Sequence, residues 1–202
     1  DLDSDGVKEI YFGSDNEALH GYNSFGEEID GFPFQSTDRV RSSPAVGDVD
    51  NDGQMEIVFG NSSGKLYIVN HDGTQQLAYN ILGFIEGSPA LVDMDGDQDL
   101  EIFFTTTTTS GGQLYAIHHN GITMSGFPKE LGSMWTGPAV HDIDNDGAYD
   151  IVCTTYDKEV YAVNIDGGAI KSGFPLITEG RLDISPTVVD VDSDGDYEIA
   201  VG

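Results

Sequence analysis

Acidic residues recur in short, nearly identical blocks along the 202-residue chain. Each block has acidic side chains at its first, third, fifth and ninth positions, and an apolar run follows the ninth. Carboxylates this close together repel one another unless a cation lies among them. Ca²⁺ takes roughly six to eight oxygen ligands of this kind. The blocks therefore predict calcium sites built from Asp1, Asp3, Asp5 and Glu9; Asp48, Asp50, Asp52 and Glu56; Asp93, Asp95, Asp97 and Glu101; Asp142, Asp144, Asp146 and Asp150; and Asp190, Asp192, Asp194 and Glu198.

Three other interpretations of the blocks fit the sequence less well. An EF-hand needs a Glu at position 12 and flanking helices, but position 12 is apolar or aromatic in every copy and the flanks are strand-like. Mg²⁺ fits less well because it keeps several waters and binds through one or two carboxylates. Any single block can also be an ordinary Asp-Gly turn, and it is the recurrence of all five that favours metal binding.

The elements that position these blocks form an internal repeat. The blocks begin at 1, 48, 93, 142 and 190, so their spacing is 45–49 residues. This spacing divides one domain into repeats 1–47, 48–92, 93–141 and 142–189, with a partial repeat at 190–202. If each repeat forms one blade of a ring, the four repeats could close into a compact four-bladed ring or be a segment of a larger one. The segment is favoured because the first and last blocks fall in the same part of the repeat.

Each repeat contains four short apolar segments. A Pro-led segment precedes the block, a β-branched run follows it, and a third segment lies beyond the next turn. A weaker fourth segment follows a Gly-Phe-Pro triplet in three repeats. The segments after the blocks lie at 9–12, 56–59, 101–104, 150–153 and 198–201, with clear hairpin partners at 65–69, 113–117 and 159–163. No sustained helical period occurs, so the pattern predicts an all-β fold, a β-propeller of four-stranded blades.

Composition excludes several classes of partner. The chain has 36 Asp and Glu against 8 Lys and Arg, a formal net charge of −28, which repels nucleic acid and anionic membranes. No apolar run approaches the roughly 18–20 residues that span a bilayer, so membrane insertion is not expected. The missing initiating Met and basic leader indicate a mature or excised part of a larger multidomain chain. The single cysteine, Cys153, allows no internal disulfide and is predicted to be a buried structural thiol.

Other motifs carry weaker signals. Residues 60–64 match the letters of a nucleophile elbow, G-x-S-x-G, but they lie between two predicted strands and are better explained as a hairpin turn. His118 and His119 could form a zinc pair, although turn histidines on a polar rim are favoured. Trp135 could stack on a sugar ring, but packing is the favoured role for the recurrent aromatic residues.

The chain resembles the FG-GAP repeats of integrin α-subunit propellers and the similar VCBS repeats of secreted bacterial proteins. Phe12-Gly13 and Phe59-Gly60 match one half of the motif, and Gly137-Pro138-Ala139 matches the other. The resemblance implies that each loop also binds Ca²⁺ through the main-chain carbonyl at its seventh position, here Val7, Gln54, Asp99, Ala148 and Asp196. The third copy departs from the pattern because Gln98 stands where Gly is usual, so the weakest or most distorted site is expected there.

The resemblance further implies a ring of seven or eight blades in which calcium braces loops. We expect a non-enzymatic module, secreted or at the cell surface or in a periplasm, that displays loops for adhesion to a protein or glycan. The alternative is the propeller portion of a secreted polysaccharide lyase. A lyase needs a base and a cation or Arg at the sugar acid, and Arg39, Arg41, Lys129 and Arg181 form no evident cluster in the sequence.

Overall fold

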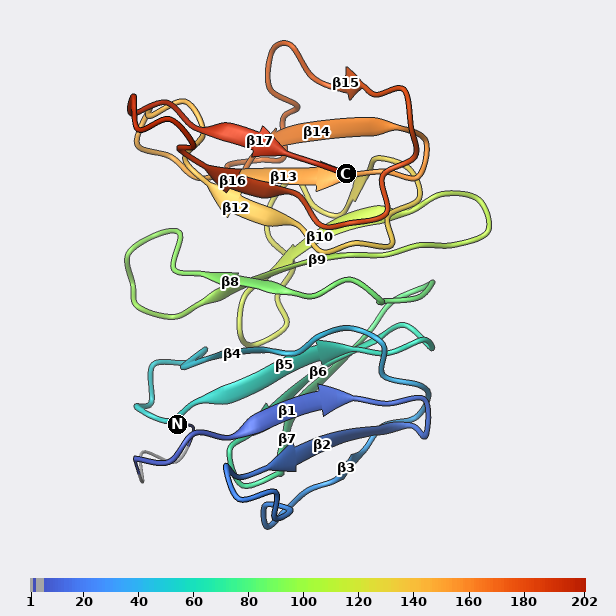
Figure 1. Ribbon diagram of the computed structural model, residues 1–202, viewed down its shortest axis with the longest axis vertical. Coiled ribbons are helices and arrows are strands. Elements are labelled where there is room, and N and C mark those ends of the chain that lie inside the picture. Colours follow the sequence, from blue (N-terminus) through green and yellow to red (C-terminus); the bar gives the residue numbers. More distant parts are fainter. Residues whose placement is uncertain (1, 3–5) are drawn as a thin grey trace.

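A computed structural model describes residues 2 and 6–202, and these residues form strands and connecting turns with no helix (Figure 1). No membrane-spanning helix is therefore found in this part of the chain. Three sheets have four antiparallel strands each, paired in chain order: β4 (Ala45–Gly47), β5 (Glu56–Gly60), β6 (Lys65–Asn70) and β7 (Gln75–Asn80); β8 (Ala90–Val92), β9 (Glu101–Thr105), β10 (Gln113–Ile117) and β11 (Lys129–Glu130); and β12 (Ala139–His141), β13 (Asp150–Thr154), β14 (Glu159–Asn164) and β15 (Leu176–Ile177).

The two end sheets are smaller, and each contains part of the same pattern. The first holds β1 (Ile10–Gly13), β2 (Ala18–Tyr22) and β3 (Phe34–Gln35), and the last holds β16 (Thr187–Val189) and β17 (Glu198–Ala200). The first four sheets follow one another from the bottom to the top of Figure 1. Among the described residues, the first and last sheets make no contact with each other, so the sheets form an open arrangement.

The second strand of each complete sheet is its most buried element. All residues of β5, β9 and β13 are buried, which fits their β-branched and aromatic composition. Alternate side chains of β5 face different neighbours, because successive residues of a strand point to opposite faces. Ile57 and Phe59 pack in the cluster shared with the first sheet, whereas Val58 packs in the cluster shared with the third.

The core therefore consists of apolar layers between successive sheets. A third layer contains Phe103, Leu114 and Cys153, and a fourth joins Val152 and Val160 to side chains of the last sheet. The exposed side chains of Ile10 and Phe12 occupy the register positions of Ile57 and Phe59, which are buried. The outer face of the first sheet thus has the composition of an interior layer.

The all-β class and the antiparallel four-stranded sheets predicted from the sequence are confirmed. The fourth strand follows the Gly-Phe-Pro triplet directly in β3, β11 and β15, each of two residues. The repeat that lacks the triplet has the six-residue β7 instead, because no proline removes a backbone donor there. The repeat boundaries and the number of blades stay predictions.

Candidate metal centres

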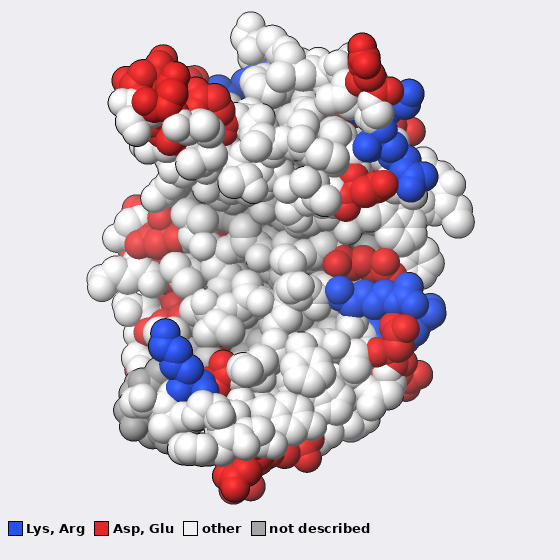
Figure 2. All heavy atoms as spheres, in the orientation of Figure 1, with Lys and Arg blue, Asp and Glu red and all other residues white. Residues whose placement is uncertain are grey.

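In the second to fifth sheets the acidic blocks form the hairpin loops between the first and second strands, and the first block precedes β1. Strand register fixes their geometry: the ninth-position residue pairs with the residue just before the loop, as in Gly47 with Glu56, Val92 with Glu101 and His141 with Asp150. The ninth-position carboxylate therefore stands at the base of its loop. These loops lie on the left side of Figure 1, and acidic side chains gather along the same edge of the molecular surface (Figure 2).

The four fully described loops share one backbone conformation. Their fourth and sixth residues adopt positive φ angles, for example 55° at Asn51 and 89° at Gly53. The turn directs backbone N–H groups at the first carboxylate: Asp52 and Gly53 each donate to Asp48 over 3.0 Å. The corresponding donors in the fourth and fifth loops reach Asp142 and Asp190 over 2.8–3.2 Å. Each first-position Asp is thus held in place by its own loop.

Another hydrogen bond recurs in every loop: the ninth-position carboxylate accepts it from the N–H of the residue at position 2. The bond is present in all five copies, with N–O distances of 2.7 Å at Glu9, 2.9 Å at Glu56, 3.0 Å at Glu101, 3.4 Å at Asp150 and 2.9 Å at Glu198. The longest distance belongs to the only Asp in the set. This bond orients the ninth-position side chain toward the loop.

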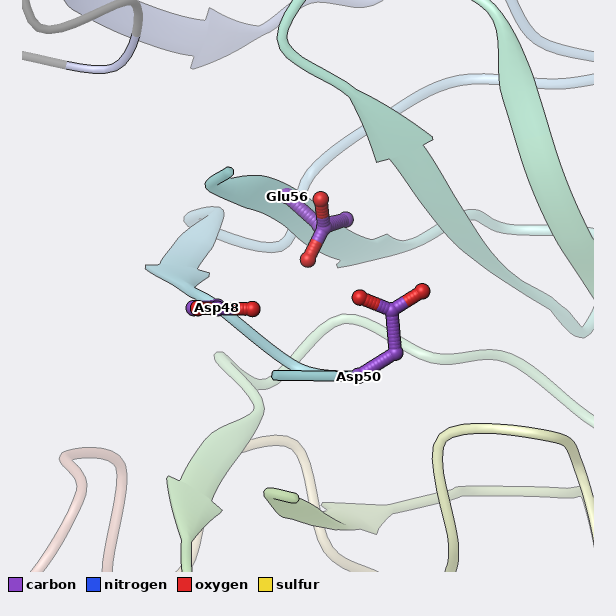
Figure 3. Close-up of side chains that lie close together, drawn as sticks. All are labelled: Asp48, Asp50 and Glu56. Carbon is purple, nitrogen blue, oxygen red and sulfur yellow. The ribbon is translucent and has the colours of Figure 1, made fainter. Parts of the chain in front are cut away.

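The second loop brings three predicted ligands together. Carboxylate oxygens of Asp48, Asp50 and Glu56 all lie within 4.8 Å of one another, and the three groups face a common point (Figure 3). Glu56 is only 2% exposed. One carboxylate oxygen of Asp50, Oδ1, is buried without a hydrogen-bond partner, while Oδ2 accepts from Nε2 of Gln76 over 2.7 Å. A buried, unpartnered carboxylate oxygen is costly, and a cation among these oxygens would satisfy it.

The electrostatics of Glu56 support the same conclusion. Burial is the main cause that raises the pKa of Glu56 to about 7, the Val49 N–H opposes the shift, and the charges of Asp50, Asp52 and Asp48 raise it further. The ionised form of this side chain is therefore unfavourable until a positive charge is near. The group has the character of a cation ligand in a site that is held ready by the fold.

The third loop keeps the shared backbone despite its altered sequence. Gln98 adopts φ 80° at the position where the other loops have Gly, and its N–H donates to Asp93 over 3.2 Å. Oxygens of Asp93, Asp95 and Glu101 lie within 4.8 Å of one another. Glu101 is 1% exposed and lies 3.0 Å from Nδ1 of His118. The loop therefore keeps the positive-φ turn of the other copies, but the N–H of Gly96 at position 4 donates to Asp93 over 2.7 Å, where position 5 donates in the other loops. Its expected weakness in metal binding stays a prediction.

In the fourth and fifth loops the clustered carboxylates come from other block positions than in the second and third loops. Their clusters consist of positions 1, 3 and 5: Asp142, Asp144 and Asp146, and Asp190, Asp192 and Asp194. In the fourth loop the ninth-position Asp150 is 2% exposed and is bonded to Lys171 instead. Burial raises the pKa of Asp150, although Lys171 lowers it in part.

Some predicted ligands are not among these groups. In the first loop Asp1, Asp3 and Asp5 lie outside the described residues. In three other loops one predicted ligand is not part of the carboxylate cluster: Asp52 and Asp97 at position 5, and Glu198 at position 9. The main-chain ligands implied by the family resemblance, Val7, Gln54, Asp99, Ala148 and Asp196, also stay predictions.

The remaining motifs have structural explanations. Residues 61–64 form the turn between β5 and β6, so the G-x-S-x-G letters do not form a strand-to-helix elbow. Nδ1 of His118 and Nδ1 of His119 each lie 3.0 Å from an oxygen of a different acid, Glu101 and Asp99 respectively. Among the described residues no candidate metal group includes a histidine. Cys153 is buried in the third core layer, and burial raises the pKa of its thiol strongly.

Lys171 was missed by the sequence analysis. The residues equivalent to Lys171 in the first and third repeats are Ile29 and Met124, since their N–H groups make the same hydrogen bond to the preceding strand. The sequence signal for Lys171 is therefore a charged residue where these repeats have an apolar one. Both of those residues pack in apolar layers. A lysine at an otherwise apolar position is visible in the sequence once the repeats are aligned on their strands.

Together these observations define an all-β repeat protein with propeller-like sheets and an acidic hairpin loop in each repeat. A family model described as FG-GAP-like repeat matches residues 1–59 and 48–104, which together span just over half of the chain. The chain belongs to the FG-GAP-like repeat family. No curated protein sequence matches it.

Solved structures of similar fold include the biofilm matrix protein Bap1 of V. cholerae, with a TM-score of 0.70 and 18% identity over 100% of this chain and 33% of Bap1. The C-terminal domain of PilY1 from Pseudomonas aeruginosa has a TM-score of 0.66 and 15% identity over 96% of this chain and 52% of that one. BamB from Moraxella catarrhalis has a TM-score of 0.58 and 18% identity over 96% of this chain and 57% of BamB. The chain thus spans from a third to under three fifths of these proteins.

Proposed function

We propose that the acidic loops bind Ca²⁺ and that bound calcium stabilises a repeat module of an extracellular protein. One observation carries the proposal: Asp48, Asp50 and the buried Glu56 converge within 4.8 Å while an oxygen of Asp50 is buried without a partner. A divalent cation would neutralise these carboxylates and occupy the unsatisfied oxygen. Carboxylate-rich, water-poor coordination favours Ca²⁺ over Mg²⁺, since Mg²⁺ dehydrates reluctantly.

The energetic consequence depends on free calcium. Extracellular calcium modules have Kd values of about 10⁻⁴–10⁻³ M. At about 2 mM free Ca²⁺, a site with a Kd of about 10⁻⁴ M stabilises the folded state by about 1.8 kcal/mol. Several such loops would together account for much of the net stability of a domain of this size. Such weak sites are filled only where calcium is plentiful, which supports a location outside the cell or in a periplasm.

Thermal unfolding tests the proposal directly. The protein is melted in excess chelator, then across a Ca²⁺ titration, with Mg²⁺ as the parallel series. We expect Tm to rise with Ca²⁺ and to change little with Mg²⁺. A Tm indifferent to Ca²⁺, together with no bound metal by elemental analysis, would contradict the proposal.

A matched pair of variants assigns the effect to the loops. D50N removes one charge at the second loop, whereas D166N removes one charge at an exposed turn outside the acidic blocks. We expect D50N to bind one Ca²⁺ fewer than wild type and to gain less Tm on calcium addition. D166N should behave as wild type. Equal behaviour of the two variants would show that calcium acts through general charge neutralisation rather than at this site.

The wider role follows from the family and the sheet arrangement. We propose that the repeats 1–47, 48–92, 93–141 and 142–189, with the partial repeat 190–202, form part of a ring of seven or eight blades. The apolar outer face of the first sheet supports this, since its residues match buried positions of the next sheet. A module that displays loops for adhesion to a protein or glycan fits these features, and the fold likeness to a biofilm matrix protein is consistent with it.

No observation on the described residues favours the lyase alternative. Each arginine lies near an acid: Arg39 near Asp38, Arg41 near Asp15, and Arg181 near Asp183, at 3.6, 2.8 and 3.2 Å. Arg181 also lies over the ring of Tyr156. Each arginine is therefore already close to an acidic side chain of this chain.

A further inference from the structure

The buried carboxylates at the ninth position have different partners in three loops. Glu56 has no ion-pair partner among the described residues, Glu101 contacts His118, and Asp150 contacts Lys171. The three loops share positive φ angles at positions 4 and 6, and the second and fourth also share their first-position hydrogen bonds. The charge that faces the buried acid therefore distinguishes loops of similar backbone.

The ammonium of Lys171 lies between two predicted calcium ligands. Its Nζ donates to both oxygens of Asp150, at 2.9 and 2.8 Å, and lies 2.7 Å from Oδ2 of Asp144. Asp144 and Asp150 are positions 3 and 9 of the fourth loop. In the second loop the same two positions are Asp50 and Glu56, which converge with Asp48 on the candidate metal site.

The fold holds Lys171 firmly in this place. Its N–H donates to the carbonyl of Ala162 in β14 over 2.9 Å, and its side chain is only 14% exposed. Burial alone would lower the pKa of Lys171, but the hydrogen bonds to Asp144 and Asp150 raise it overall, so the amine stays charged. The shorter Asp at position 9 retracts the carboxylate, as its 3.4 Å bond to the N–H of Ile143 shows.

We propose that Lys171 is a built-in counter-ion that takes the place of calcium at the ninth-position end of the fourth loop. This inference rests on the proposed calcium function of the other loops. The ammonium supplies one positive charge and three donors where a divalent cation would otherwise bind. It satisfies Asp150 and Asp144 permanently, so the fourth loop is ordered without calcium and binds calcium weakly or not at all. The chain thus combines calcium-dependent loops with one that is independent of calcium.

The repeat itself supplies the variant that tests this. K171M introduces the residue found at the equivalent position of the third repeat, Met124, and leaves Asp150 buried without a cation. In excess chelator we expect Tm to fall by roughly 5–15 °C, as for a broken buried ion pair in a domain of this size. With calcium present, K171M should bind one Ca²⁺ more per chain than wild type, measured by equilibrium dialysis with elemental analysis, and should regain most of the lost Tm.

K171Q and K129M complete the experiment. K171Q removes the charge but keeps a neutral hydrogen-bond donor, like the Gln76 amide that donates to Asp50. If K171M does not fold, the calcium stoichiometry and Tm of K171Q test the counter-ion role instead. K129M makes the same substitution on β11, outside the acidic loops, and should change neither calcium stoichiometry nor the chelator Tm.

Failure of this inference is distinct from failure of the proposed function. If the Lys171 variants bind no more calcium than wild type, Lys171 does not replace calcium, whatever the wild type binds. If wild type binds no calcium in any loop, the proposed function is wrong. A Lys171 variant that gains one Ca²⁺ would still support the counter-ion role in that case.

Discussion

Nδ1 of His118 lies 3.0 Å from Oε1 of Glu101, a carboxylate that is 1% exposed at the base of the third loop. His118 is the first residue after β10, and Glu101 begins β9, so the antiparallel pairing of these strands brings the two side chains together. This contact gives the buried acid a side-chain hydrogen-bond partner, whereas among the described residues Glu56 accepts only from the Val49 N–H. The two loops should therefore respond differently when metal is removed.

The first prediction concerns this pair. H118Q removes the imidazole from Glu101, and we expect a loss of about 1 kcal/mol in metal-free protein, or about 2–4 °C in Tm, since His118 is partly exposed. Thermal unfolding in chelator measures the loss. The same change made in an E101Q background should cost little, because the coupling vanishes with the carboxylate charge. Equal losses in both backgrounds would show that His118 acts through packing alone.

The second prediction uses the pKa of Glu56, which burial raises to about 7. An acid whose pKa is higher in the folded than in the unfolded state favours folding in its protonated form. Metal-free protein should therefore lose stability as pH rises from about 4.5 through 7. E56Q should remove this loss, so that at pH 8 in chelator it melts above wild type.

The same E56Q variant should gain less from calcium, because a charged ligand is lost. Thermal melts at several pH values, with and without calcium, measure both effects. A metal-free E56Q protein that is less stable than wild type at pH 8 would contradict the assigned cost of burying this charge.

The third prediction concerns the departure in the third loop. Gln98 has φ 80°, where three other loops have Gly at 89–96°. A left-handed conformation costs a non-glycine residue about 1–2 kcal/mol, partly offset by the greater freedom of Gly in the unfolded chain. Q98G should therefore stabilise the protein by about 0.5–1 kcal/mol in urea unfolding. The converse change, G53Q, should destabilise it by a similar amount. A destabilising Q98G or a stabilising G53Q would show that the two loops do not share this backbone.

The fourth prediction concerns the Phe-Gly pair of the family motif. A β-carbon placed on Gly60 would overlap Ile85, whose side chain is fully buried against the end of β5. G60A should destabilise the protein by about 1–3 kcal/mol through overpacking. G180A is the control, since nothing lies within 4 Å of the corresponding position. Similar unfolding midpoints for G60A and wild type would mean that the core relaxes around the added methyl group.

Much of the fold and of the candidate sites was predictable from local sequence. The block spacing identified the repeat, and the runs after each block identified β5, β9 and β13, because a buried strand is encoded by contiguous apolar residues. The carboxylates of Asp48, Asp50 and Glu56 were predicted as ligands because a tight loop brings nearby residues together. Even so, the sequence did not show that the third loop keeps its turn with Gln98 in place of Gly.

Only the tertiary structure decided which charge faces each buried acid. Lys171 lies 21 residues from Asp150 and His118 lies 17 residues from Glu101, so neither pair belongs to one local motif. Strand register brings them together: hydrogen bonding of the segment after β14 places Lys171 beside the fourth loop, where the equivalent residues of other repeats enter apolar layers. The sequence by itself determined the acidic loops and the strands that hold them. Long-range pairing of those strands decided how each loop balances its charge, because burial and partner distance exist only once the sheets have formed.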